Sequence, residues 1–277
     1  MTISYEGGPG VTVNVFQALR AWLDSSEAVV PETELFPSGQ TAEQTQQQDT
    51  EQMASSQETA TAAAFTQLRI PYQTQVVVTA TVAGLPAHSV LKAGDQILSV
   101  DGKAVTGQSD LSSLITSHPA GSVLQLTVLR AGQTLHLAVG SKNVDGAPVI
   151  GVQVQEEYKF PFSVKISVGA IGGPSAGMMF ALGIIDKLTP MNLTGGKFIA
   201  GTGEITAAGQ VEAIGGIQQK MIAARDAGAT IFLTPASNCS DTAGAVPAGL
   251  QIVKVSTLTQ AIDDLEAIKA GKPVPSC

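Results

Sequence analysis

Residues 168–185, VGAIGGPSAGMMFALGII, contain no charged side chain, and an uncharged run of this length belongs in a protein core or in a membrane. Four glycines and a proline fall within its first ten residues, which makes a straight lipid-facing helix a poor fit. A single serine, Ser175, follows Gly173 and Pro174 in the middle of the run. The run therefore predicts a loop that places a serine at the start of a buried helix.

Two known hydrolase patterns occur in the chain, but neither is complete. Residues 173–177 satisfy G-x-S-x-G, the nucleophile pattern of α/β hydrolases, in which a histidine base follows the serine. All histidines of the chain precede the serine: His88, His118 and His136. Ser89 and Lys92 fit S-x-x-K, yet the K-T-G and S-D-N elements of β-lactamases do not occur. Neither pattern supplies a base for Ser175.

A lysine can act as the base when burial lowers its pKa, because burial disfavours the ammonium form. In residues 216–228, GIQQKMIAARDAG, Lys220 lies three residues after Ile217 and four before Ala224. These residues share one face of a helix, so Lys220 is predicted to border the apolar side. The alternative is a lysine whose stem lies on apolar surface while its ammonium stays in water.

The charge balance excludes several kinds of partner. The net charge is -8, and only 15 lysines and arginines are spread over 277 residues, which argues against a nucleic-acid surface. No Gly-Lys pair is followed by Ser or Thr, so the chain has no Walker A motif for ATP. No zinc-ligand spacing occurs, and the sequence indicates neither metal nor cofactor. Cys239 and Cys277 leave two alternatives open, a disulfide in an oxidising compartment or two free thiols.

The first stretch, residues 1–70, is predicted to be helical. VNVFQALRAWLD has Val15, Leu19 and Trp22 at helical spacing, which predicts an amphipathic helix. Residues 40–68 are rich in Gln, Thr, Ala, Ser and Glu. They predict a long exposed helix whose apolar end, 62–68, packs on a neighbour, with a disordered linker as the alternative.

Two further stretches follow, residues 71–140 and residues 141–277. The middle one has strand patterns and turn signals at Asp101-Gly102 and at Ala131-Gly132, which predict a small β-rich module. The last one alternates predicted strands, among them PVIGVQV and FSVKISV, with helices, the first over 175–186. The fold class expected for the whole chain is α+β, with mixed helices and sheets.

The β-rich stretch resembles a bacterial PDZ domain. The matching residues are GLPAHSVLKAGDQILSVDGKAV, then DLSSLI, then SVLQLTVLRAGQTLHLAV. PDZ domains hold peptides by adding them as a strand to a sheet edge, so the resemblance implies a peptide-binding module. A clear Gly-Leu-Gly-Phe-like carboxylate-binding loop is missing, and the alternative is a spacer or gate that binds nothing.

The last stretch resembles the proteolytic domain of Lon proteases over most of residues 150–268. The residues that carry the resemblance are GGPSAG, GTGEITAAGQVEAIGGIQQKMIAAR and GATIFLTPASN. It implies a Ser-Lys dyad with Ser175 as nucleophile and Lys220 as general base, and Thr202 as the residue that orients the lysine. Lon enzymes commonly have Asp where this chain has Gly172, so the help of that carboxylate is not expected here.

The local chemistry agrees with these roles. Pro174 fixes a dihedral that suits the start of a helix, and Gly173 lets a substrate backbone approach closely. Amides at a helix start, including the Ser175 N–H, point towards a developing oxyanion and can stabilise it.

A PDZ-like module followed by a Lon-type domain resembles the PDZ-containing Lon-like proteases of Gram-positive bacteria, particularly actinobacteria. The resemblance implies an ATP-independent serine endopeptidase for exposed or unfolded polypeptides, in which the PDZ-like module presents substrate or gates access. It also implies a homo-oligomer and an extracytoplasmic, membrane-associated location, through an anchor expected upstream of a chain that is itself soluble. A non-catalytic peptide-binding scaffold with a Lon-like fold is the alternative.

Overall fold

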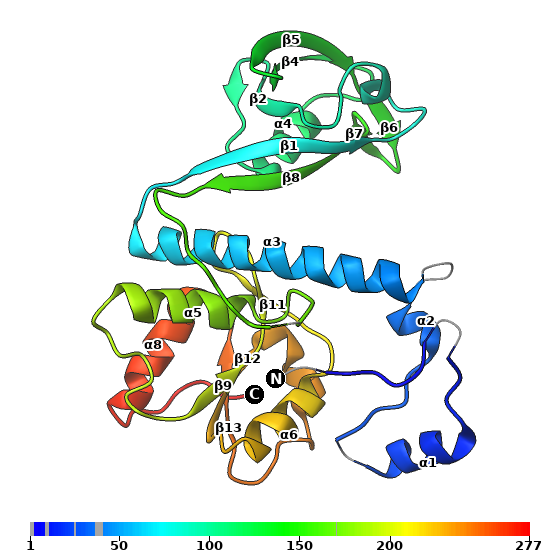
Figure 1. The fold of residues 1–277 in the computed structure, drawn as a ribbon. Coiled ribbons are helices and arrows are strands. Elements are labelled where there is room, and N and C mark those ends of the chain that lie inside the picture. The colour runs from blue at the N-terminus through cyan, green and yellow to red at the C-terminus, as the bar shows by residue number, and fades with distance from the viewer. Residues whose placement is uncertain (1–2, 9–10, 25, 37–40, 170) are drawn as a thin grey trace. The chain divides into compact units, whose positions relative to one another are not determined.

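The computed structural model describes residues 3–8, 11–24, 26–36, 41–169 and 171–277 (Figure 1). They form two compact units, a β-rich unit of residues 71–161 and a composite unit drawn from residues 1–70 and 162–277. The division predicted after residue 140 differs from the structure, because strand β8 (Val152–Lys159) pairs with strand β1 (Gln73–Thr81). The N-terminal stretch is likewise not a domain by itself, since it packs with the last stretch of the chain.

The β-rich unit is built on an antiparallel sheet with the strand order β5-β4-β2-β1-β8, and β3 pairs with β2. Its elements are β1, the 3-10 helix η1 (Pro86–Ser89), β2 (Gln96–Val100), β3 (Lys103–Ala104), α4 (Gln108–Thr116), β4 (Val123–Arg130), β5 (Gln133–Gly140), β6 (Lys142–Val144), β7 (Ala147–Val149) and β8. Both predicted turns are present, and Asp101-Gly102 and Ala131-Gly132 have the positive φ angles that two-residue hairpin turns require.

An ion pair is buried beside the apolar core of this unit. Asp95 accepts hydrogen bonds from Arg130 Nε at 2.6 Å, from Arg130 Nη2 at 2.7 Å and from the backbone N–H of Lys92 at 2.8 Å. Burial alone would raise the pKa of Asp95, but the bonds from Arg130 and Lys92 outweigh it and hold that pKa below its usual value. The paired carboxylate therefore fixes the turn before β2 against the end of β4.

The composite unit combines a parallel sheet in the order β13-β12-β9, the antiparallel pair β10-β11 and several helices. Its elements are α1 (Val15–Leu23), α2 (Glu32–Leu35), α3 (Ala42–Leu68), α5 (Gly177–Leu188), β9 (Ile199–Gly201), β10 (Glu204–Ile205), β11 (Val211–Glu212), α6 (Ile217–Asp226), β12 (Ile231–Pro235), the 3-10 helix η2 (Ala236–Asn238), α7 (Cys239–Thr242), β13 (Gln251–Val255) and α8 (Leu258–Lys269). With its mixed helices and sheets, the structure confirms the predicted α+β class.

Helix α3 is the long helix predicted from composition, which rules out the linker alternative. Thr41 and Gln44 form a capping box at its start, where each side chain accepts the other's backbone N–H. Its apolar end is buried at residues 62–65, and the helix packs against α5, β10 and α8 (Figure 1). Gln40, where the predicted helix begins, lies outside the described residues.

Helix α1 forms where predicted, but its apolar residues do not pack into a core. Asn14 and Gln17 cap the start of the helix reciprocally. No residue of α1 is buried, and Trp22 is 81% exposed. The spacing of the apolar residues therefore predicted the helix correctly, and its apolar residues are exposed.

The predicted strand FSVKISV is not part of a sheet. Residues 163–168 alternate between exposed and half-buried, as a strand does, yet no described strand pairs with them. Period-2 patterning reports alternating burial and says nothing of hydrogen-bonding partners.

The structure joins Cys239 and Cys277 in a disulfide, with their Cα atoms 5.1 Å apart. Of the two alternatives that the sequence left open, the cross-linked one is present, and it ties the C-terminal tail to the start of α7. Within the described part of the chain, no helix combines the length and apolar character needed to span a membrane.

Candidate functional site

Ser175 lies in a turn directly before helix α5. Gly173 adopts a φ of +84°, which glycine tolerates without strain, and the Pro174 carbonyl accepts the Gly177 N–H at 3.2 Å. Helix α5 therefore begins at Gly177. The prediction that this helix begins at Ser175 is wrong. Its apolar body is buried, including Met178, and this packing anchors the turn that carries Ser175.

Lys220 meets Ser175 from a second helix, α6. Its Nζ donates a hydrogen bond of 2.8 Å to Ser175 Oγ. The residue is only 6% exposed and shares its buried face with Met221 and Ala224, so the predicted apolar placement is confirmed. The alternative, with the ammonium in water, is wrong.

Thr202 connects the two residues. Its Oγ1 accepts a long hydrogen bond of 3.5 Å from Lys220 Nζ and donates one of 2.9 Å to the Ser175 carbonyl. The Gly203 N–H donates to the same carbonyl at 2.8 Å. Thr202 is buried, so it holds the serine backbone and the lysine head in one fixed arrangement.

The surroundings of Lys220 lower its pKa. Burial lowers the pKa of Lys220, and the nearby Glu204 carboxylate opposes this by attracting the proton. Burial also raises the pKa of Glu204, Glu212 raises it further, and Lys220 lowers it. Glu212 lies directly opposite Glu204 in the β10-β11 pair. Lys220 therefore loses its proton more readily than an exposed lysine does.

Asn238 holds the segment that leads into α6. Its side-chain oxygen accepts the Ile214 N–H at 2.9 Å, and its side-chain nitrogen donates to the Ile214 carbonyl at 3.0 Å and to Asp241 Oδ2 at 2.9 Å. Asn238 is the last residue of GATIFLTPASN, but no pattern in the sequence indicates its role. A buried amide can bond both groups of one residue's backbone, which an apolar residue cannot.

Helix α3 packs on the serine turn from the other side. The Asp49 carbonyl accepts the Gly173 N–H at 3.0 Å, and Ser56 Oγ donates to the Pro174 carbonyl at 3.0 Å. A Cβ at Gly172 would lie 2.6 Å from Asp49 Cβ, so this close contact requires glycine. Beside it lies a cavity of about 200 Å³, lined by four α3 residues together with Pro174, Glu204 and Ile205.

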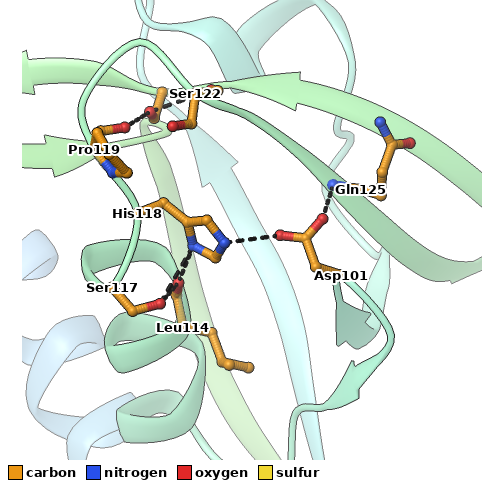
Figure 2. A network of polar contacts seen from close by, with 8 residues as sticks. Asp101, Leu114, Ser117, His118, Pro119, Ser122 and Gln125 are labelled. Atoms are coloured by element: carbon orange, nitrogen blue, oxygen red, sulfur yellow. Dashed lines mark hydrogen bonds and ion pairs between the residues drawn. The ribbon is translucent and has the colours of Figure 1, made fainter.

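The histidines belong to the β-rich unit. Figure 2 shows His118 between two backbone segments, with Nε2 3.3 Å from Asp101 Oδ2 and Nδ1 donating to the Leu114 carbonyl at 2.8 Å. Asp101 in turn accepts the Gln125 N–H at 2.9 Å. This arrangement ties loops of the β-rich unit together, and its residues belong to a different unit from Ser175.

Among the residues that the structure describes, no three His, Cys, Asp or Glu side chains gather in a group suited to a metal ion.

Comparison with protein families identifies about three quarters of the chain. The model of the Lon protease (S16) C-terminal proteolytic domain matches residues 63–267. The chain is 28% identical over 193 residues to the Lon protease of Syntrophomonas wolfei, covering 66% of this chain and 22% of that protein. It is 35% identical over 152 residues to the Lon protease of Dictyoglomus thermophilum, covering 54% and 18%. The chain thus spans about a fifth of the length of these relatives.

Solved structures give a weaker match. The PDZ domain of the SdrC-like protein from Listeria monocytogenes is 26% identical, with 28% of this chain and 85% of that domain covered and a TM-score of 0.28. A solution structure of the second domain of a Listeria protein is 22% identical, covers 32% of this chain and 89% of that domain, and also has a TM-score of 0.28.

Proposed function

Because the chain belongs to the Lon protease (S16) C-terminal proteolytic domain family, we propose that it is a serine endopeptidase that cleaves exposed or unfolded polypeptides without ATP. One observation carries the proposal, the 2.8 Å hydrogen bond between buried Lys220 and Ser175. A desolvated amine at this distance from a hydroxyl can act as the general base that activates a serine nucleophile.

In the proposed reaction, neutral Lys220 accepts the hydroxyl proton of Ser175 while Oγ attacks the carbonyl carbon of the scissile peptide bond. The lysine then gives this proton to the leaving amine, the C–N bond breaks, and an acyl-enzyme remains. Next, Lys220 takes a proton from a water molecule whose oxygen attacks the ester. The acid product leaves, and the proton returns to Ser175 Oγ.

Two further groups support this chemistry. Among the described residues, the Ser175 N–H donates no hydrogen bond, which leaves it available to the oxyanion that forms on the substrate. Thr202 contacts both the lysine head and the serine backbone, and its proposed role is to keep Lys220 aimed at Ser175.

The β-rich unit is proposed to present substrate to the site or to gate access to it. Its sheet ends in strands β5 and β8, whose outer edges pair with no other strand in the described part of the chain. An extended peptide binds to such an edge through backbone hydrogen bonds. A fluorescent unfolded peptide that binds residues 71–161 produced alone would support presentation, whereas binding only to the composite unit would contradict it.

An extracytoplasmic, membrane-associated location and a homo-oligomeric state complete the proposal. The Cys239–Cys277 disulfide supports the location, because disulfides persist in oxidising compartments and are rare in the cytosol. Thiol labelling in intact cells would test the pairing, and light scattering of the purified chain would test the oligomeric state.

The decisive experiment measures cleavage of an unfolded protein by the wild type, Ser175→Ala and Lys220→Ala, without nucleotide. Ser167→Ala and Lys187→Ala are matched controls, because both residues are exposed in the composite unit. Cleavage by the wild type and both controls, lost in the two site variants, is expected. If the wild type binds the unfolded protein but cuts it no faster than Ser175→Ala, the chain is a peptide-binding scaffold and not a peptidase.

A further inference from the structure

We propose that Ser56, on helix α3, is a positioning residue that fixes the peptide group presenting the Ser175 N–H to the reacting carbonyl. The inference rests on the proposed peptidase function. It adds to that function a residue from a helix that carries none of Ser175, Thr202 and Lys220. Ser56 also precedes residues 63–267, which match the family model.

The contact is specific and shielded from water. Ser56 is 7% exposed, and its Oγ donates a hydrogen bond of 3.0 Å to the Pro174 carbonyl, which lies 118 positions later in the chain. Ser55, the preceding residue of α3, is exposed. The buried hydroxyl that bonds the carbonyl before the nucleophile therefore belongs to Ser56, and the adjacent Ser55 hydroxyl is exposed.

The geometry of the peptide bond explains why this carbonyl matters. The Pro174 carbonyl and the Ser175 N–H belong to one planar trans peptide group, so they point in opposite directions. When Ser56 holds the oxygen against α3, the N–H is directed away from α3. Rotation of this peptide group would move the N–H off the oxyanion, and Ser56 opposes that rotation.

A second contact holds the peptide group that joins Gly172 to Gly173, two groups before the one that carries the Ser175 N–H. The Gly173 N–H donates to the Asp49 carbonyl of α3 at 3.0 Å. A Cβ at Gly172 would meet Asp49 Cβ at 2.6 Å, so the turn and the helix are in direct contact there. Helix α3 thus binds one N–H and one carbonyl of the turn, and the second of these bonds fixes the peptide group that carries the Ser175 N–H.

The test compares Ser56→Ala with Ser55→Ala, using kcat, KM and the affinity of a peptide boronate that forms a tetrahedral adduct with the serine. Ser56→Ala is expected to lower kcat roughly tenfold and leave KM within about twofold, because the lost contact supports the transition state and not substrate binding. Boronate affinity should fall by the same factor as kcat, a change that a merely structural role would not produce. Ser55→Ala removes a hydroxyl from the same cavity lining but none that bonds the turn, so it should keep the kcat and the boronate affinity of the wild type.

Gly172→Ala provides a second route, because its new methyl group would push Asp49 and α3 away from the turn while the Ser56 hydroxyl remains. It should also lower kcat and boronate affinity together, and it decides the question if Ser56→Ala fails to fold. The inference is overturned if Ser56→Ala has the same kcat as Ser55→Ala, or if its kcat falls while its boronate affinity is unchanged. Either result counts against the inference alone when Ser175→Ala remains inactive. If Ser175→Ala cleaves as well as the wild type, it is the proposed function that fails.

Discussion

Replacing Asn238 with alanine should destabilise the composite unit and displace the lysine of the site. The Asn238 side chain bonds both the N–H and the carbonyl of Ile214, at 2.9 and 3.0 Å, in a buried environment. Alanine would leave both backbone groups without these partners. A buried polar group left unsatisfied costs about 1–3 kcal/mol, so the loss of both partners should lower the free energy of unfolding by about 2–6 kcal/mol.

The assay must resolve the composite unit, because a chain with two compact units does not necessarily unfold in a single transition. Hydrogen exchange in increasing urea, followed by mass spectrometry of peptides from each unit, gives separate unfolding midpoints. Ser237→Ala is the matched control, since Ser237 is exposed in the same turn, η2. Peptides from residues 71–161 should exchange as in the wild type.

The variant should also lose activity before it unfolds. Ile214 lies three residues before α6 begins, so release of its backbone lets the start of that helix shift, and Lys220 shifts with it. We expect a lower kcat for Asn238→Ala in the absence of urea. A free energy of unfolding that differs from that of the wild type by less than about 0.5 kcal/mol, the range of ordinary surface substitutions, would refute the reasoning.

Three further predictions follow from the buried charges and the disulfide. Since burial lowers the pKa of Lys220, kcat/KM should rise with pH and level off below the usual pKa of lysine, and a profile still rising at that usual value would contradict the assignment of Lys220 as the base. Asp95→Asn should cost the β-rich unit about 2–3 kcal/mol near neutral pH, below the usual range for a broken buried pair because Arg130 is 25% exposed. The pKa of folded Asp95 is depressed, so this stability is present above the unfolded pKa and is lost as pH falls through the folded one, and urea midpoints of wild type and variant should converge in acid. Cys277→Ser removes the disulfide to Cys239, which closes a loop with a sequence separation of 38, and should lower the free energy of unfolding by about 2–4 kcal/mol. Adding a reductant to this variant should cause no further loss.

Local patterns were enough to predict much of the fold. Turn residues at Asp101-Gly102 and Ala131-Gly132 predicted hairpins, and the structure has both. Helical spacing predicted that Lys220 faces the apolar side of its helix, and it is buried there. In each case the information lies within a few residues, where backbone preference and hydrophobic period act directly.

Long-range contacts were not predictable in this way. The boundary after residue 140 failed because the partner of β8 is β1, at the opposite end of the β-rich unit in the chain. The bonds of Asn238 to Ile214 and of Ser56 to Pro174 join side chains to backbone groups 24 and 118 positions away. Such contacts depend on backbone positions that exist only after folding, and they leave no period in the sequence.

The geometry of the site is set mainly by side chains that bind backbone and not by the two central residues themselves. Thr202 binds the carbonyl of Ser175, Ser56 binds the carbonyl before it, and Asn238 binds the segment ahead of the helix that carries Lys220. The Asn238 contacts also satisfy the N–H and the carbonyl of Ile214, which would otherwise be costly to bury. Removing any one of the three side chains should reduce kcat while KM changes little, and removing Asn238 should reduce stability as well, whereas removing the Ser175 hydroxyl should abolish turnover.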